Sequence, residues 1–321
     1  MYTIGIDLGG TNIAVGLCDE NLKIVHTLKA KTHKRREPDE IVADMARLAR
    51  ELMESYALTA DEVKCIGIAT PGIVNTDDGI VEYSCNLPFK NYPLAERFRG
   101  MLSGIPVKII NDANAAALAE ALVGAAKGTR SSVTLTLGTG VGSGIIIDGQ
   151  IYTGGIGYSG AELGHMVIKA GGRRCGCGRY GCMEAYASAT GLKSSTRAYM
   201  DKLRKEGGDS KLFEITEKYG KISARAPFAA MREGDRHGAI LVEKFIEYLA
   251  VGIANIINIF APEVIIIGGG VSGEGDGLIA PLVKRVNEEL YPDGRETKTR
   301  ITVATLGSKS GMVGAGGIGR D

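Results

Sequence analysis

The sequence repeats one unusual pattern, an apolar strand that turns on glycines and returns as a second apolar strand. The first copy runs from Tyr2 to Asp7, turns through "LGGTN" from Leu8, and continues as "IAVGLCD". The second copy is "SVTLTLGTGVGSGIIIDG", from Ser132 to Gly149. Each copy predicts a β-hairpin with a glycine-rich tip. Two such hairpins predict two related lobes, which restricts the chain to a duplicated architecture.

The segments around these hairpins alternate between strand and helix patterns. "DEIVADMARLARELMESY" has helical spacing, and "VKIIN" at Val107–Asn111 is a strand that leads directly into an alanine-rich helix. Residues 186–260 read as helices, and "PEVIIIGGG" predicts a late buried strand. A last strand and a short glycine-rich helix close the chain. This alternation predicts an α/β fold. We expect a small lobe at 1–118, a large lobe at 119–304, and packing of the final 305–321 segment back onto the small lobe.

Composition limits the classes of function. The chain has 321 residues, 44% apolar and 23% charged, enough for two globular lobes. A net charge of +1 gives no general attraction to nucleic acid or to an anionic membrane. No apolar run approaches the roughly 20 residues that span a bilayer. The N-terminus lacks the layout of a signal peptide, so we expect a cytoplasmic protein with reduced thiols.

The two glycine-rich tips are candidate phosphate-binding loops. Backbone N–H groups can converge on an anion there because glycine has no Cβ. One such loop is as easily an ordinary tight turn, but two similar loops at corresponding places favour phosphate binding. The candidate residues are Gly9, Gly10, Thr11, Asn12, Gly138, Thr139 and Gly140.

Other phosphate-binding motifs fit less well. The chain has no Gly-x4-Gly-Lys-Ser/Thr motif, and the Gly-x-Gly-x-x-Gly from Gly268 lacks an acidic residue at a strand end about 20 positions later. An adenine or ribose contact by Gly268, Gly269 and Gly270 fits this segment better than a dinucleotide fold.

Two acidic residues end strands beside ligand-binding positions. Asp112 stands at the junction of a strand and a helix, where it is either a helix cap or a base that accepts a proton from a substrate hydroxyl. Asn111 and Asn114 flank it, and a cap needs only one of these three side chains. Asp7 ends the first strand, where it either stabilises the turn or holds Mg²⁺ directly or through water.

"RRCGCGRYGC" holds three of the six cysteines. Three thiols cannot pair completely among themselves, and Cys175, Cys177 and Cys182 supply three of the four ligands that zinc prefers. His165 is the nearest candidate for the fourth, and a reduced thiol cluster without metal is the alternative. The other cysteines, Cys18, Cys65 and Cys85, lie in or beside strand-like runs, so we expect them to be buried.

A metal in this segment would also fix its polar neighbours. A zinc-bound histidine has a second ring nitrogen that can donate to a substrate hydroxyl. Together with the carboxylates of Glu162 and Glu184, His165 suits a polyhydroxylated ligand such as a sugar.

These motifs together resemble those of the ROK family of sugar kinases, and its bacterial glucokinases in particular. "IGIDLGGTNIAVGL", "NDANAAALAE", "LTLGTGVGSGIIIDG", "AELGHM" and "CGCGRYGCMEAYASATG" stand in the family's order across essentially the whole chain. The cysteine signature is specific to the family, whereas the glycine hairpins are shared with actin-like ATPases. One small departure is Ala161, where many relatives have glycine. The "NLPF" at Asn86 departs from the aromatic-rich version of some glucokinases.

The resemblance implies a two-lobed actin-like (ribonuclease H-like) α/β fold with an interlobe cleft for ATP and a hexose. Asp112 matches the catalytic base, and the glycine loops match the phosphate and adenosine positions. The implied sugar contacts are Gly72, Asn86, Asn111, Glu162, His165 and Glu184. The implied zinc ligands are His165, Cys175, Cys177 and Cys182. The implied reaction is ATP- and Mg²⁺-dependent phosphorylation of D-glucose, by a homodimer or higher oligomer.

Alternatives stay open at this point. Another sugar, such as N-acetylmannosamine, fructose, allose or mannose, would use the same motifs, and the sequence does not exclude polyphosphate as a donor. A sugar-responsive transcription regulator would need an N-terminal helix-turn-helix, for which the strand starting at Tyr2 leaves no room. A zinc-only interaction module leaves both hairpins and Asp112 without a role.

Overall fold

The computed structural model describes the chain except for residues 103, 159, 293–295 and 320–321. The chain divides into two compact units. Unit 1 comprises Met1–Thr134, Gly144–Ala161 and Thr305–Asp321, and unit 2 comprises Leu135–Ser143 and Glu162–Ala304. The lobe boundary expected at 118 stays a prediction, and the end of the expected 305–321 segment, at 320 and 321, lies outside the described residues. Among the helices described, none has the length and apolar character needed to cross a membrane.

The two five-stranded sheets have the same strand order. The first has the order β3-β2-β1-β4-β8, and its strands are β1 Tyr2–Leu8, β2 Asn12–Cys18, β3 Ile24–Lys31, β4 Val63–Thr70 and β8 Val107–Asn111. The second has the order β11-β10-β9-β12-β13, and its strands are β9 Ser132–Leu137, β10 Val141–Ile147, β11 Gln150–Tyr152, β12 Val264–Gly268 and β13 Arg300–Val303. In both sheets three consecutive strands precede two later ones, as the repeated hairpin predicts.

A three-stranded sheet and ten α-helices complete the described chain. The small sheet contains β5 Ile73–Asn75, β6 Ile80–Tyr83 and β7 Lys90–Tyr92. The helices of unit 1 are α1 Pro38–Ser55, α2 Leu94–Met101, α3 Asp112–Val123 and α10 Ser310–Gly317. Those of unit 2 are α4 Glu184–Ala187, α5 Ala189–Lys205, α6 Lys211–Lys218, α7 Ala226–Arg232, α8 Arg236–Phe260 and α9 Asp276–Glu289.

One face of the first sheet packs against α1. The even-numbered Ile4 and Ile6 of β1 are fully buried in the same core cluster as Ile41 and Met45 of α1. The helix begins where the sequence signals it, with Pro38 in the first turn and a capping box between Glu37 and Glu40. The predicted helix over 39–56 is thereby confirmed.

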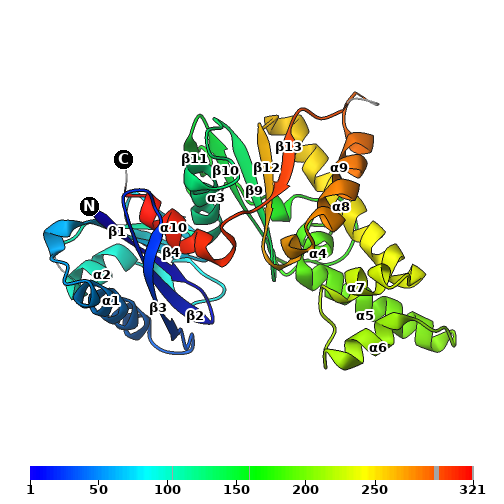
Figure 1. Ribbon diagram of the computed structural model, residues 1–321, viewed down its shortest axis with the longest axis horizontal. Coiled ribbons are helices and arrows are strands. Elements are labelled where there is room, and N and C mark those ends of the chain that lie inside the picture. The colour runs from blue at the N-terminus through cyan, green and yellow to red at the C-terminus, as the bar shows by residue number, and fades with distance from the viewer. Residues whose placement is uncertain (103, 159, 293–295, 320–321) are drawn as a thin grey trace. The chain divides into compact units, whose positions relative to one another are not determined.

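The opposite face of the same sheet packs against α10, and glycines permit an unusually close approach (Figure 1). A Cβ at Gly5 of β1 would lie 1.8 Å from the carbonyl oxygen of Met312, and one at Gly67 of β4 would lie 1.8 Å from that of Ala315. The backbone of α10 therefore rests directly on the sheet, where only glycine leaves room for it.

The segment that leads into α10 is held by a buried carboxylate on α3. Glu120 is fully buried and accepts hydrogen bonds from the backbone N–H groups of Thr305 and Leu306, both at 2.9 Å. It also accepts from the Thr305 hydroxyl at 2.9 Å and from Ala125 N–H at 2.7 Å. Four donors thus satisfy this carboxylate without a cationic partner among them.

Candidate active site

The predicted site residues fall into two groups, one in each unit. Asp7, Gly9–Asn12, Gly72, Asn86, Asn111 and Asp112 belong to unit 1. Gly138–Gly140, Glu162, His165, Cys175, Cys177, Cys182, Glu184 and Gly268–Gly270 belong to unit 2.

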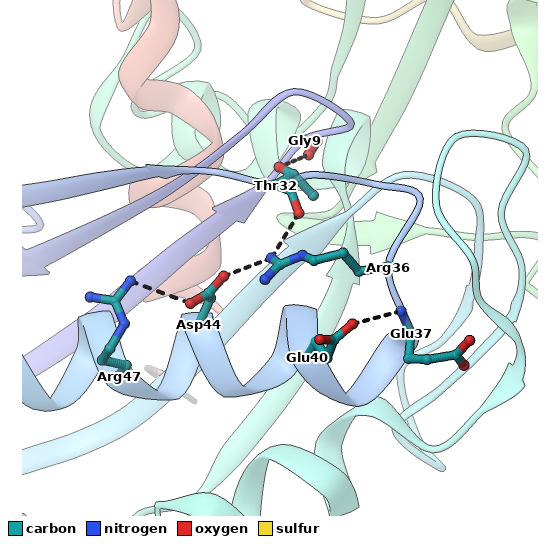
Figure 2. A network of polar contacts seen from close by, with 7 residues as sticks. All are labelled: Gly9, Thr32, Arg36, Glu37, Glu40, Asp44 and Arg47. Carbon is teal, nitrogen blue, oxygen red and sulfur yellow. Dashed lines mark hydrogen bonds and ion pairs between the residues drawn. The ribbon is translucent and has the colours of Figure 1, made fainter.

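The first glycine hairpin forms as the sequence predicts, because β1 and β2 pair antiparallel and Gly9 N–H donates to the carbonyl of Asn12 at 3.0 Å. A buried threonine that directly follows β3 holds the tip of the hairpin in place. The Thr32 hydroxyl donates to the Gly9 carbonyl at 2.6 Å (Figure 2). Thr32 N–H donates to the Thr11 carbonyl at 3.0 Å. The tip is therefore held on both sides of Gly10.

An arginine in turn fixes Thr32. The guanidinium of Arg36 donates to the Thr32 carbonyl at 2.9 Å and pairs with Asp44 of α1 at 2.6 Å (Figure 2). Asp44 also lies 3.4 Å from Arg47 one helical turn later. No sequence signal marks this support for the hairpin, because Thr32, Arg36 and Asp44 match no motif and only the packing of α1 against the sheet brings them together.

Asn111, and not Asp112, caps α3. Its Oδ1 accepts from the N–H groups of Ala113 and Asn114 at 2.9 and 3.1 Å, and its Nδ2 donates to the Gly72 carbonyl at 2.9 Å. Gly72 has φ +119°, and a Cβ there would lie 2.1 Å from the Tyr83 carbonyl oxygen, so glycine is required. Asp112 is the first helical residue, and its carboxylate accepts from Ala113 N–H at 2.9 Å.

The pKa values of both Asp7 and Asp112 are raised. Burial, and then the neighbouring Asp112, raise the pKa of Asp7 to about 6, and Lys29 opposes this shift. Although solvent reaches part of Asp112, desolvation by the surrounding protein raises its pKa as well, against the lowering effect of the Ala113 hydrogen bond. A Cβ at Gly311 would lie 2.7 Å from Asp7 Oδ2, so the first turn of α10 lies against this carboxylate.

Asn86 lies beside the first hairpin and is exposed. A Cβ at Gly10 would contact the Asn86 carbonyl oxygen at 3.6 Å. Its neighbour Cys85 is exposed too, so the expectation that Cys85 is buried was wrong, whereas Cys18 and Cys65 are buried as expected. The reason is that Cys85 lies in the loop between β6 and β7 and not in a strand.

In unit 2 the second glycine hairpin lies against Glu184. Gly138 N–H donates to the Gly140 carbonyl at 3.0 Å, and Val141 N–H donates to Glu184 Oε2 at 3.0 Å. A Cβ at Gly140 would lie 2.2 Å from the same carboxylate oxygen. The glycine therefore admits the carboxylate to the tip, and Thr139 is exposed beside it.

The turn that contains Glu162 and His165 lies on the strand that follows this tip. Gly164 is buried, and a Cβ there would lie 2.1 Å from the Val141 carbonyl oxygen. Leu163 N–H donates to the Ser143 hydroxyl at 3.0 Å, which ties the turn to β10. Unit 2 thus brings Glu162, His165 and Glu184 to the beginning of one strand, and Ser143 is a supporting residue that no sequence signal marked.

The four predicted zinc ligands lie together. Their donor atoms, on His165, Cys175, Cys177 and Cys182, are all within 4.8 Å of one another. His165 Nδ1 and Cys175 Sγ are 3.7 Å apart, and so are the sulfurs of Cys177 and Cys182. Tetrahedral zinc with its usual bond lengths places two sulfurs about 3.8 Å apart and sulfur and nitrogen about 3.6 Å apart. The donor set and its spacing therefore fit zinc.

The surroundings of the cluster link it to the second hairpin. The Cys175 thiol donates to Glu184 Oε1 at 3.3 Å, and burial raises the pKa of Cys175 to about 12. Such a thiol stays protonated at neutral pH unless a cation takes the place of its proton. Since Nδ1 of His165 faces the sulfurs, Nε2 is the nitrogen left for another partner.

The late glycines adjoin the same hairpin. Gly268 ends the buried strand β12, and Gly269 has φ +82°. A Cβ at Gly269 would lie 2.5 Å from the carbonyl oxygen of Leu137, the residue before Gly138. Gly270, which has open space around its Cα, begins the short 3₁₀ segment Gly270–Glu274.

Comparison with known proteins shows that the chain belongs to a family of known proteins. The model of the ROK family matches residues 3–320. A glucokinase of Thermotoga maritima is 35% identical over 316 residues, which cover 98% of this chain and 96% of the relative.

Solved structures agree in fold. A ROK family glucokinase from Streptomyces griseus, solved with glucose and AMPPNP, superposes with a TM-score of 0.82 at 31% identity and 99% coverage of both chains. A ROK family transcriptional regulator, a homologue of the Escherichia coli MLC protein, gives a TM-score of 0.85 at 29% identity, covering 99% of this chain and 78% of that one. The predicted actin-like α/β fold is thereby confirmed.

Proposed function

Because the chain belongs to the ROK family, we propose that it is an ATP-dependent hexose kinase that converts D-glucose to glucose 6-phosphate. The observation that supports this most is that Asn111, and not Asp112, caps the start of α3. Asn111 caps the helix, which leaves the carboxylate of Asp112 available for a substrate hydroxyl. The glucokinases among the relatives, and the neighbour bound to glucose and AMPPNP, support glucose and ATP as the substrates.

In the proposed reaction Asp112 accepts the proton of the sugar 6-hydroxyl while that oxygen attacks the γ-phosphorus of ATP. Backbone N–H groups of the two glycine hairpins bind the phosphates, and Gly268–Gly270 contact the adenosine. Mg²⁺, when bound, would neutralise phosphate charge, and Asp7 is the residue proposed to hold it directly or through water. The base orients the nucleophile, and charge neutralisation and positioning supply most of the catalysis.

Sugar recognition is proposed for Gly72, Asn86, Asn111, Glu162, His165 and Glu184. His165 would bind zinc through Nδ1 and donate from Nε2 to a sugar hydroxyl. Zinc, when bound, would fix this tautomer and hold the cysteine segment in place. Since Glu184 contacts both the cysteine cluster and Val141 of the second hairpin, metal binding and the phosphate loop share one carboxylate.

A cytoplasmic location and a homodimer or higher oligomer belong to the same proposal. Free thiols persist in the cytoplasm, and all six cysteines are unpaired. ATP is available there as well.

The test is ADP release with Mg-ATP across a panel of glucose, mannose, N-acetylmannosamine, N-acetylglucosamine, fructose, allose and no sugar. We expect the highest kcat/KM with glucose. Activity with a different sugar alone would replace the substrate and keep the kinase. Sugar binding without turnover of any donor would instead favour a sugar-responsive regulator like the neighbour of that class.

The Asp112→Asn variant tests the base. We expect kcat to fall by about 10²- to 10⁴-fold while the Kd for glucose changes little, because the amide still hydrogen-bonds but cannot accept the proton. Asp201→Asn, at an exposed position on α5, is the matched control and should keep full activity. Retained turnover in Asp112→Asn would remove this residue from the role.

A further inference from the structure

Unit 1 has a hollow of about 670 Å³ that the proposed reaction does not use. Its lining comes from the turn between β5 and β6, from α2, β8, α3 and β11, and from the end of α10, all within unit 1. None of the residues proposed for the sugar, the phosphates or zinc is part of this lining. A volume of this size is typical of sites for small molecules.

The apolar part of the lining is only partly covered by the protein. Ile110 of β8 is buried, whereas four further aliphatic residues of the lining are half-buried, namely Leu118, Leu122, Ile151 and Ile318. Leu118, Ile151 and Ile318 pack against the small core cluster that contains Ile110. This cluster therefore has an incompletely covered face, and an apolar group in the hollow would remove that face from water.

Two exposed cations of the lining have donors that the protein leaves unused. Arg99 of α2 donates from Nε to the Ala95 carbonyl at 3.1 Å, and Lys108 of β8 donates from Nζ to the Ile318 carbonyl at 3.2 Å. Neither cation forms an ion pair with a residue that the structure describes. Each bond fixes one donor of the cation, and the remaining N–H groups are available to an anion.

The two acidic residues of the lining already have donors. Asp77 accepts from the Tyr158 hydroxyl at 2.5 Å, and Asp78 accepts from Asn75 Nδ2 at 2.8 Å. The lining therefore has two positive and two negative charges, of which only the positive ones lack an ionic or hydrogen-bonding partner at their outer atoms. This arrangement favours an anionic ligand over a cationic one. The nearby carboxylates also favour a monoanion, such as a carboxylate, over a phosphate dianion, because they repel the dianion more strongly.

We propose that this hollow binds a medium-chain aliphatic carboxylate. The carboxylate lies at Arg99 and Lys108, and the aliphatic chain lies on Leu118, Ile151 and Ile318. A purely polar ligand would leave the apolar lining uncovered, and a neutral apolar ligand would not use the two cations. The inference goes beyond the proposed kinase function and does not depend on it. Leu118 belongs to α3, so a ligand in the hollow would contact the helix that begins with the proposed base.

The first experiment measures binding to the full-length protein by isothermal titration calorimetry, without sugar or ATP. The ligands are octanoate, 1-octanol, octylammonium and acetate. We expect octanoate to bind at one site per chain and 1-octanol to bind about 10-fold more weakly or less, because it lacks the charge-assisted hydrogen bonds. Octylammonium and acetate should not bind in the same concentration range. Equal affinities for octanoate and 1-octanol, or tighter binding of octylammonium, would overturn the proposal.

The length of the carboxylate and the presence of glucose distinguish the hollow from other sites. From butanoate to octanoate the Kd should fall about 4-fold for each CH₂, because each one covers more of the apolar lining. Saturating glucose should change the Kd for octanoate less than about 2-fold, since the hollow shares no residue with the proposed sugar site. A Kd independent of chain length, or competitive displacement by glucose, would contradict the proposal. Neither readout requires kinase activity, so a failure of the proposed function would leave this test intact.

The double variant Arg99→Gln/Lys108→Gln tests whether the two cations hold the carboxylate. We expect its Kd for octanoate to rise about 10-fold or more and its Kd for 1-octanol to change less than about 2-fold, which separates the loss of charge from a general loss of structure. Lys90→Gln/Arg97→Gln removes the same charges from exposed positions of unit 1 outside the lining and is the matched control. Equal effects of the two double variants on octanoate binding would overturn the proposal.

Discussion

At the scale of single residues, several polar side chains have roles that are set by their hydrogen bonds or by a neighbouring charge. The amide of Asn111 caps α3 and bonds the Gly72 carbonyl, so the cap does not need Asp112, the residue proposed as the base. Glu120 spends both carboxylate oxygens on the segment before α10. Asp112 lies close enough to Asp7 to help raise the pKa of Asp7, after the larger effect of burial. Each of these positions therefore requires a particular hydrogen-bonding group or charge.

Glu120→Gln should destabilise the protein by about 2–4 kcal/mol. The amide would turn an NH₂ group toward two of the four donors, which would then lose their acceptor inside the part-buried site. Urea unfolding followed by circular dichroism measures this change. Glu217→Gln, at an exposed position on α6, is the control and should stay within about 0.5 kcal/mol of wild type. Wild-type stability in Glu120→Gln would mean that the carboxylate charge adds nothing here.

At the scale of elements, two short segments depend on close contacts made by very few atoms. The helix α10 is fixed by glycine contacts with β1 and β4. The segment from Cys175 to Cys182 is fixed by the cysteine cluster and by backbone bonds such as Cys175 N–H to the Arg179 carbonyl at 2.8 Å. Both segments should therefore be sensitive to changes of very few atoms.

Gly67→Ala should destabilise the protein by about 3 kcal/mol or more. The added Cβ would lie 1.8 Å from the carbonyl oxygen of Ala315, so α10 would have to move off the sheet. Gly100→Ala, in α2, has no neighbour within 4 Å and should leave stability unchanged or raise it by up to about 1 kcal/mol. Thermal and urea unfolding of the pair measure the contrast, and equal effects would contradict the packing argument.

Zinc removal should loosen unit 2 locally. We expect about one zinc per chain in the purified protein by elemental analysis, and loss of that zinc in Cys177→Ser, because the hydroxyl is a poor substitute for a thiolate ligand. The melting temperature of Cys177→Ser should be lower than that of wild type, because the zinc is lost. Cys85→Ser, at an exposed cysteine outside the cluster, should keep both the zinc and the melting temperature. Full zinc occupancy in Cys177→Ser would exclude the four-ligand site.

At the scale of the whole molecule, the sequence predicted what depends on local patterns. The paired hairpins, the helix after "VKIIN", the glycine-rich last helix and the gathering of His165 with the three cysteines are all confirmed. Each of these features follows from residues that are only a few positions apart in the sequence. The roles proposed for the site residues stay predictions.

What the sequence did not predict depends on partners far apart in the chain. Thr32 supports Gly9 from 23 residues away, and Glu120 binds Thr305 from 185 residues away. The sequence around a single threonine or glutamate does not indicate which distant residue it contacts. Gly5 and Gly67 are similar, because an ordinary strand glycine and a glycine that admits a helix backbone look alike until the helix is placed.

Global stability should depend on pH through Asp7. Its pKa is about 6 in the folded protein against an ordinary 3.8, so the folded state binds this proton more tightly than the unfolded state. The stabilisation is complete below about pH 3.8 and is lost as the pH rises through about 6. Stability without Mg²⁺ should therefore fall by on the order of 1–3 kcal/mol from this residue between pH 4 and 7.

Urea unfolding in EDTA at several pH values measures this dependence. In Asp7→Asn the fall should be smaller, while Asp201→Asn should behave as wild type. Parallel pH curves for wild type and Asp7→Asn would contradict the raised pKa.

The position of α10 also has a consequence for synthesis on the ribosome. The strands β1 and β4 are synthesised well before α10, the helix that covers their glycine face. Until residues 305–317 are released, the nascent chain must keep that face uncovered, open to chaperones and to proteases. Ribosomes that stall or terminate before this point would release an unfinished first unit. The stability of the first sheet therefore depends on translation having passed α10.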